Sequence, residues 1–276
     1  MPRLRYSRLE VPRKAGDDAV VGLLSLHDPL GFEAAGKDLV AYFREAASAR
    51  AASERLRFAR VRHALTTDIP EGDPLEAYRA RSKAFAVGRR LWIDPGDSAS
   101  PAAPTARFAL RIPASRAFGT GSHASTRLAL EALEDEALEG KTVLDVGTGS
   151  GILALAAAAL GARTAVGFDV DADAIFVARE NCTRHPFGAR VRLFAGPPAA
   201  CGGEFDLVVA NMLADELLPE SRRLLARAGR RGRVLLSGIT REREAGVLAR
   251  FRTGRWKLEG RRTDEEWSCL CLARAS

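Results

Sequence analysis

From residue 142 to the carboxyl end, short apolar runs alternate with longer segments of helical pattern. The runs are bounded by polar or glycine-containing turns, which is typical of buried strands connected by helices. Strands are predicted at 142–146, 164–168, 191–194, 205–210 and 233–237, helices at 152–160, 171–184, 217–228 and 241–251, and a final hairpin at 256–262 and 267–272. This order predicts an α/β fold with a doubly wound, mostly parallel, seven-stranded Rossmann-like sheet that ends in an antiparallel edge.

The first part of the chain has a less regular pattern. Strands are predicted at 4–11, 39–43, 58–65 and 91–93, and helices at 18–26, 47–56 and 74–84. Such a mixture indicates a small α+β domain, for which a ferredoxin-like arrangement is a candidate. Residues 94–104 are rich in proline, serine and alanine, which is typical of a connection between domains. We therefore expect an N-terminal domain over 1–93, a linker over 94–107 and a second domain over 108–276.

The composition is that of an ordinary globular protein. Hydrophobic residues make up 46% of the chain, but no apolar run approaches the roughly 20 residues that span a bilayer. The first residues lack the apolar core of a secretory signal, and the four cysteines have no CxxC spacing. We therefore expect a cytoplasmic protein with reduced, mostly buried thiols and no metal site. The net charge of +7 comes almost entirely from arginine spread along the chain, and without a recognition motif we do not expect direct nucleic-acid binding.

A glycine-rich turn, DVGTGSG at 145–151, follows the first strand of the second domain. Doubly wound folds bind their ligand at this turn, at the carboxyl edge of the sheet. A phosphate-binding P-loop is rejected, because the GKT tripeptide at 140–142 precedes the strand and lacks its first glycine. A dinucleotide fingerprint fits poorly, because bulky Ile152 occupies its third glycine position. The GxGxG spacing after an aspartate instead resembles methyltransferases that use S-adenosylmethionine (AdoMet).

The second strand of this domain ends in acidic residues about 20 positions beyond the glycine turn, where such a side chain can accept hydrogen bonds from both ribose hydroxyls of a nucleoside. Asp169 is predicted to be this ribose ligand. The alternative is that Asp169 caps the following helix, a role for which Asp171 competes. For Asp145, two alternatives remain open: it braces the turn or contacts the methionyl amine of AdoMet indirectly, or it binds the ligand directly.

Further strings resemble the PrmA-type ribosomal-protein methyltransferases. Residues 117–126, AFGTGSHAST, resemble the family's AFGTGTHPTT, and the turn matches over 143–155. Residues 209–214 and 236–239 resemble its VVANILA and LSGI strings. The resemblance runs in register from about residue 74 to the carboxyl end, whereas residues 1–73 match only in length and rough strand order.

The resemblance implies an enzyme that methylates amino groups of a large-subunit ribosomal protein, with AdoMet as methyl donor. It places cofactor contacts at Thr126, Gly147, Asp169 and Asn211, and the glycine turn adds Gly149. Asn211 is also predicted to be catalytic, because an amide at a strand end beside the turn can face the incoming amine. The alternative for Asn211 is a hydrogen bond to its own loop. The first domain, by the same resemblance, recruits the protein substrate.

The expected reaction is a direct displacement in which an amine attacks the sulfonium methyl in line. Burial beside the sulfonium cation lowers the pKa of the target lysine, so no strong base is required. His123 is expected to cap or pack rather than to act as a base, and Thr126 taken alone is equally a helix-start residue. Two other functions remain open: a protein-lysine methyltransferase with another target, and a noncatalytic AdoMet-binding protein.

Overall fold

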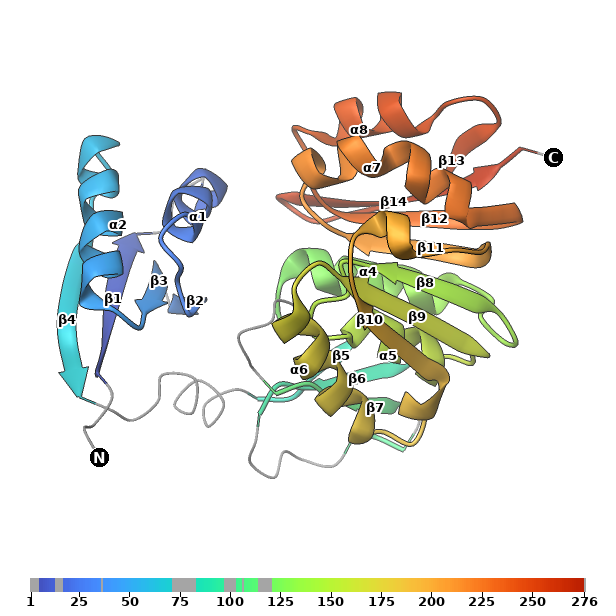
Figure 1. The fold of residues 1–276 in the computed structure, drawn as a ribbon, viewed down its shortest axis with the longest axis horizontal. Helices are drawn as coiled ribbons and strands as arrows, with labels where there is room; N and C mark the ends of the chain where they lie inside the picture. The colour runs from blue at the N-terminus through green and yellow to red at the C-terminus, as the bar shows by residue number, and fades with distance from the viewer. Residues whose placement is uncertain are drawn as a thin grey trace. The chain divides into compact units, whose positions relative to one another are not determined.

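The chain forms two compact units, Met1–Ala77 and Tyr78–Ser276. The structure is a computed structural model of the 276-residue chain (Figure 1). It describes residues 5–12, 17–35, 37–70, 83–96, 103–105, 107–113 and 121–275. The helix predicted at 74–84 falls almost entirely outside the described residues, as do residues 97–102 of the predicted linker.

The boundary between the units lies earlier than the sequence pattern predicts. The strand predicted at 91–93 is β6 (Leu91–Asp94), which forms a three-stranded sheet with β5 (Phe85–Val87), a strand that was not predicted, and with β7 (Phe108–Arg111). Their side chains Leu91 and Ile93 are fully buried in the core of the second unit. By its contacts the chain divides at residue 77, and not at the predicted residue 93, because the apolar side chains of this hairpin are buried in the core of the second unit.

The first unit has the element order and strand order of a ferredoxin-like fold. Its elements are β1 (Arg5–Pro12), α1 (Asp17–Ser25), β2 (Gly31–Ala35), β3 (Asp38–Phe43), α2 (Ala46–Phe58) and β4 (Ala64–Pro70). The sheet order is β2-β3-β1-β4, and all neighbouring strands are antiparallel. The strand expected at 58–65 is wrong: Leu56 completes the buried stripe of α2, so the helix continues to Phe58 before the chain turns into β4.

The second unit contains the predicted seven-stranded sheet. Its strands are β8 (Thr142–Val146), β9 (Thr164–Asp169), β10 (Val191–Ala195), β11 (Phe205–Asn211), β12 (Ala228–Thr240), β13 (Trp256–Thr263) and β14 (Trp267–Arg274). The connecting helices are α4 (Ala124–Asp135), α5 (Ile152–Ala159), α6 (Ala172–Thr183), α7 (Ala214–Arg227) and α8 (Glu244–Phe251), with short 3-10 turns at Gly188–Arg190 and Pro198–Ala200. The order is β10-β9-β8-β11-β12-β14-β13, parallel except at the pairs that involve β14.

Alternate residues of the parallel strands point to opposite faces of the sheet, which produces two apolar layers. Val143 lies in the layer built with α4 and α5, and Leu144 lies in the layer built with α7 and α8. Figure 1 shows α7 and α8 beside each other over β11 to β14. Because the chain moves from β8 outward to β9 and β10 and then returns to β11 on the other side of β8, strand order reverses at β8 and β11. Doubly wound folds bind ligands at this reversal.

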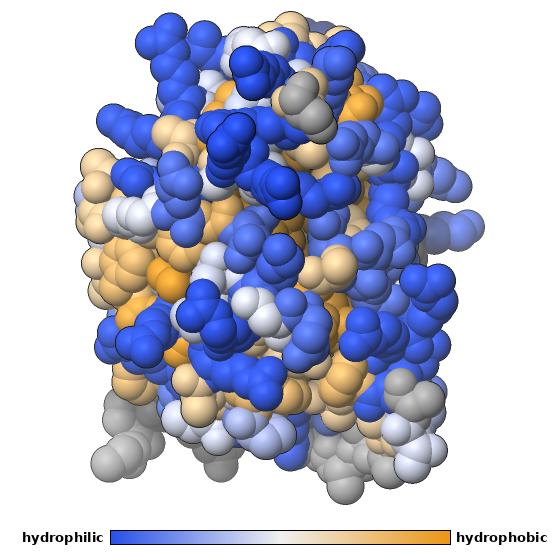
Figure 2. All heavy atoms as spheres, turned by 90° about the vertical axis from the view of Figure 1, so that its right-hand side faces the viewer, coloured by the Kyte–Doolittle hydropathy of each residue, from blue (hydrophilic) through white to orange (hydrophobic). Residues whose placement is uncertain are grey.

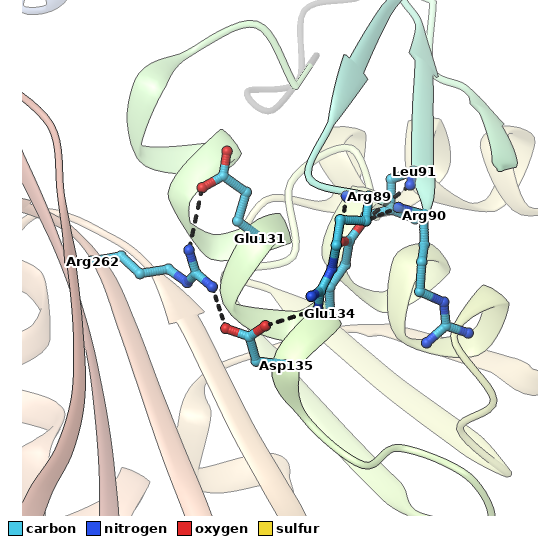
Figure 3. Close-up of polar contacts among 7 residues, drawn as sticks. All are labelled: Arg89, Arg90, Leu91, Glu131, Glu134, Asp135 and Arg262. Carbon is cyan, nitrogen blue, oxygen red and sulfur yellow. Dashed lines mark hydrogen bonds and ion pairs between the residues drawn. The ribbon is translucent and has the colours of Figure 1, made fainter. Parts of the chain in front are cut away.

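Glu134 anchors the carboxyl end of α4 to the turn between β5 and β6 (Figure 3). Its buried carboxylate accepts backbone hydrogen bonds from Arg89 at 2.7 Å, Arg90 at 2.8 Å and Leu91 at 3.0 Å. A Cβ at Gly88 in this turn would lie 2.4 Å from Glu134 Oε2, so a larger residue there would displace the carboxylate. Arg262 of β13 contacts Glu131 and Asp135 on the same helix. These contacts hold α4 between the small sheet and the edge of the large one.

Polar side chains predominate on the face of the second unit that Figure 2 shows, with small apolar areas between them. Among the described residues, no helix has both the length and the apolar character needed to cross a membrane.

All four cysteines are free, three of them buried and Cys182 half-buried, which confirms the prediction of mostly buried thiols.

Candidate active site

The glycine-rich turn that follows β8 contains three glycines, at every second position, whose φ angles are positive. The φ angles of Gly147, Gly149 and Gly151 are 66°, 52° and 81°, a region that residues with a Cβ rarely adopt. A Cβ at Gly151 would lie 3.1 Å from the Cβ of Ala178 on α6, and one at Gly147 would lie 3.3 Å from Met212 Sδ. The turn therefore depends on glycine for its backbone conformation and for its close contacts with the two neighbouring segments.

Asp145 braces this turn from inside the protein. Its Oδ2 accepts hydrogen bonds from Thr148 Oγ1 at 2.6 Å and from the backbone N–H of Ala154 at 3.1 Å. Its Oδ1 is buried and has no partner within the described part of the chain. Burial raises the pKa of Asp145 from 3.8 to about 7; the two hydrogen bonds offset only part of this effect, and the charge of Asp169 adds to it. Asp145 therefore braces the turn, which is one of the alternatives that the sequence left open.

Asp171, and not Asp169, caps the helix that follows β9. Asp171 is the N-cap of α6, where its Oδ1 accepts the backbone N–H of Asp173 at 2.8 Å. Asp169 ends β9, and its Oδ2 accepts the backbone N–H of Gly149 at 3.0 Å while its Oδ1 accepts that of Asp171 at 3.1 Å. A carboxylate has about four acceptor positions, so Asp169 keeps capacity for further donors.

Asn211 and Thr126 are 85 residues apart in the sequence and hydrogen-bonded in the structure. Asn211 is the last residue of β11, and its Nδ2 donates to Thr126 Oγ1 at 3.1 Å. Thr126 is fully buried in the first turn of α4. The other end of the amide, Asn211 Oδ1, is buried without a partner among the described residues. The amide is therefore fixed by its nitrogen, while the acceptor capacity of its oxygen is unused within the described residues.

The start of α4, which carries Thr126, is held by three contacts. His123 is the N-cap, and its ring nitrogen accepts the backbone N–H of Ser125 at 3.3 Å. The His123 ring also packs edge-on against Trp267, with centroids 4.9 Å apart. On the other side, Ser237 Oγ of β12 donates to the carbonyl of Ser125 at 2.8 Å. The capping and packing expected for His123 are confirmed, and Thr126 is indeed a helix-start residue as well as a partner of Asn211.

The predicted site residues converge at the carboxyl ends of three neighbouring strands. In the register of β8 and β11, Ala210 lies opposite Val146, so Asn211 and Gly147 extend from adjacent strands. Asp169 lies at the end of β9 and touches the same turn through Gly149. The part of the 117–126 string that precedes Gly121 lies outside the described residues.

Two residues of this region carry structural roles that the sequence pattern did not predict. Thr148 supplies the shortest hydrogen bond of the buried Asp145 carboxylate. Met212 covers Gly147, with its Cγ and Sδ each 3.3 Å from where a Cβ would lie. The sequence could have indicated the role of Thr148, because a hydroxyl three residues after a buried aspartate can donate a hydrogen bond to its carboxylate. The role of Met212 has no local signal, since it depends on the pairing of β8 with β11.

Comparison with known proteins identifies the family. The profile described as "Ribosomal protein L11 methyltransferase (PrmA)" matches residues 28–275. The chain belongs to the ribosomal protein L11 methyltransferase family. A protein of that name from Geobacter sulfurreducens is 42% identical over 205 residues, which is 74% of this chain and 67% of the relative. A namesake from Pelobacter propionicus is 38% identical over 218 residues, covering 77% of this chain and 70% of the relative.

A solved structure supports the same family. The crystal structure of a ribosomal protein L11 methylase from Lactobacillus delbrueckii subsp. bulgaricus matches with a TM-score of 0.65 and 28% identity, covering 71% of this chain and all of that one. The family match begins at residue 28, inside the first unit, whereas the motifs alone supported the resemblance only from about residue 74. The L11 methyltransferase family therefore includes most of the first unit as well as the second.

Two buried acceptor atoms in this L11 methyltransferase family member, Asp145 Oδ1 and Asn211 Oδ1, have no hydrogen-bond partner among the described residues. They belong to the paired strands β8 and β11, in which Val209 lies opposite Asp145. An unpaired buried acceptor costs about 1–3 kcal/mol, so a bound group with N–H or O–H donors has a clear reason to be favoured here. The amino group and ribose hydroxyls of AdoMet are donors of this kind, and the acceptors present fit that ligand.

Proposed function

We propose that this protein is an AdoMet-dependent protein N-methyltransferase that acts on amino groups of ribosomal protein L11. The observation that carries the proposal is the amide of Asn211, whose nitrogen is fixed by Thr126 and whose buried oxygen lacks a donor. Membership of the L11 methyltransferase family supports the substrate class. The ribosomal-protein substrate class also supports the proposal of a cytoplasmic enzyme.

The described residues suggest how the cofactor is held. AdoMet, when bound, supplies a methyl group activated on a cationic sulfur. Asp169 accepts hydrogen bonds from the ribose hydroxyls with the acceptor positions that Gly149 and Asp171 leave free. Gly147 and Gly149 present bare backbone, so the ligand can approach the turn closely. Thr126 is proposed as a cofactor contact, and its hydroxyl also accepts the hydrogen bond from the Asn211 amide.

Positioning of the amine is the main catalytic task of the chain. In this proposal Asn211 Oδ1 accepts a hydrogen bond from an N–H of the target amine, which directs the nitrogen lone pair toward the methyl group. Orientation and desolvation together supply a large share of the rate enhancement for such a displacement. A lysine amine must lose its proton before attack, and burial beside a cation lowers its pKa. We assign no general base.

The first unit is proposed to recruit the protein substrate. All of the proposed cofactor contacts lie in Tyr78–Ser276, whereas Met1–Ala77 has its own sheet and its own core around Leu9, Phe43 and Leu56. A separately folded unit without cofactor contacts is suited to binding a macromolecule. This assignment also follows the role that the sequence resemblance implies for it.

Radiolabelled methyl transfer to a cell lysate tests the proposal. A single labelled band at the mass of the ribosomal protein is the expected result. A labelled band elsewhere would indicate a methyltransferase with another protein target, and no label despite AdoMet binding would indicate a noncatalytic protein.

The role of Asn211 is tested with purified substrate at saturating AdoMet. Asn211→Ala should lower turnover by about 100-fold, the effect of removing one positioned hydrogen bond from a dry site. Thr126→Val should also lower turnover because it releases the amide nitrogen, while Thr126→Ser keeps the hydroxyl and serves as the matched control. Full recovery of Asn211→Ala at high AdoMet would mean that the amide only holds cofactor. Normal turnover with a lowered melting temperature would mean that it is only structural.

A further inference from the structure

A group of exposed arginines follows the last turns of α2 in the first unit. Arg55, Arg57, Arg60 and Arg62 are all exposed, and we call them the α2 arginine patch. From residue 55 to residue 67 the chain contains no acidic residue. The patch therefore concentrates four positive charges on one short segment, at the carboxyl end of a helix.

Ion pairs among the described residues do not neutralise the charge of these four arginines. Within the described residues, no acidic side chain forms a salt bridge with any member of the α2 arginine patch. Many exposed or half-buried arginines of the second unit are paired: Arg223 with Glu220, Arg233 with Glu136 and Glu259, Arg243 with Asp215, Arg261 with Glu244, and Arg262 with Asp135. Four unpaired positive charges on so short a segment favour the binding of an external anion.

An exposed aromatic side chain lies within the patch. Phe58 is 88% exposed. The buried residues of α2 include Ala49, Ala52 and Leu56; at about 100° per residue, Phe58 points almost directly away from this buried stripe. Arg55 and Arg57 then project on either side of the phenylalanine ring. Packing among the described residues of the first unit does not explain an apolar ring in this position.

Arg60 occupies a backbone position at which glycine is normally preferred. Its φ is 56°, and two hydrogen bonds, Arg60 N–H to the Arg57 carbonyl at 2.9 Å and Val61 N–H to the Leu56 carbonyl at 2.8 Å, form the Schellman ending of the helix. A side chain in this left-handed conformation is strained relative to glycine. The chain thus keeps a positive charge at a site where glycine would be more stable, and strain of this kind is often retained for function.

We propose that the α2 arginine patch and Phe58 bind a single-stranded RNA segment. Guanidinium groups pair with phosphates in bidentate geometry, and an exposed aromatic ring stacks on a base. A run of Asp and Glu would match the charge, but it offers no aromatic face for Phe58 to stack on. The choice of RNA as the polyanion rests on the proposed function, because a ribosomal-protein substrate is assembled together with RNA in the ribosome.

Fluorescence anisotropy of a labelled oligouridylate with the full chain tests the proposal independently of methyl transfer. If the four arginines each neutralise one phosphate, log K should fall with log salt with a slope of about −2.8. Arg57→Gln combined with Arg60→Gln should reduce the size of this slope by about 1.4. Phe58→Ala should weaken binding by about tenfold with little change in slope, because stacking is not electrostatic.

Two controls separate RNA binding from general effects. Arg222→Gln combined with Arg252→Gln removes the same charge from exposed positions of the second unit and should keep the full slope. Arg60→Gly should raise the melting temperature while weakening RNA binding, an outcome that loss of folding cannot produce. Equal losses in the patch and control variants would overturn the proposal. So would polyglutamate that binds through the patch as tightly as the oligouridylate, because the partner would then be an acidic protein surface.

Discussion

Replacing Asp145 with asparagine should change how the stability of the second unit depends on pH. The carboxylate is fully buried, with one oxygen bonded to Thr148 and Ala154 and the other without a partner in the described residues. Burial raises its pKa from 3.8 to about 7. The amide of the D145N variant keeps an oxygen that can accept both existing hydrogen bonds, and it removes the titration. The comparison therefore isolates the cost of a buried charge.

The direction and size of the effect follow from linkage. The folded protein holds the Asp145 proton more tightly than the unfolded chain, so the unfolded chain binds fewer protons between about pH 4 and pH 7, and stability falls as pH rises through this window. The stabilisation of the protonated form is fully present below pH 4 and lost by the time the folded group has ionised. The full difference corresponds to about 4 kcal/mol. Between pH 5 and pH 8 the wild type should lose about 2–3 kcal/mol relative to D145N.

Urea unfolding followed by tryptophan fluorescence measures this difference. Trp92, Trp256 and Trp267 are the three tryptophans of the chain, and all lie in Tyr78–Ser276, so the signal reports the correct unit. The quantity to compare is the free energy of unfolding of D145N minus that of the wild type, which should rise between pH 5 and pH 8. Asp171→Asn is the matched control, because asparagine caps a helix about as well as aspartate and the same charge is removed from an exposed position. A difference that stays flat with pH would refute the reasoning.

Three further predictions concern other parts of the second unit. Asp169→Ala should greatly weaken AdoMet binding in calorimetry. The control variant Asp173→Ala, which changes an exposed residue of α6, should bind AdoMet normally. Equal affinities in the two variants would exclude Asp169 from the site. Glu134→Gln should lower the free energy of unfolding by about 1–3 kcal/mol, because its new amide group faces a backbone N–H. Asp135→Asn should lower it by less than about 1 kcal/mol, because the ion pair of Asp135 is exposed. Similar losses in the two variants would argue against Glu134 as the anchor of α4. A fragment spanning Tyr78–Ser276 should bind AdoMet but fail to methylate intact protein substrate, and full activity of the fragment would exclude recruitment by the first unit.

The local patterns of the second unit were sufficient to predict its sheet. The strand at 142–146 and the turn at 145–151 are read directly from a buried apolar run followed by glycines, and the structure agrees. Parallel strands buried on both faces leave little ambiguity in sequence, because nearly every position is apolar. The positions of Asp169 and Asn211 at strand ends follow from the same runs.

Tertiary contacts decided what those patterns left open. Asp171 rather than Asp169 caps α6, which depends on the angle at which the chain leaves β9. The hairpin of β5 and β6 belongs to the second unit because Glu134, more than 40 residues away, bonds its turn. Thr126 meets Asn211 only because α4 packs where β8 and β11 pair. Hydrophobic periodicity records which face of an element is buried, but it carries no information about which distant element covers that face, and the site is assembled from such distant pairs.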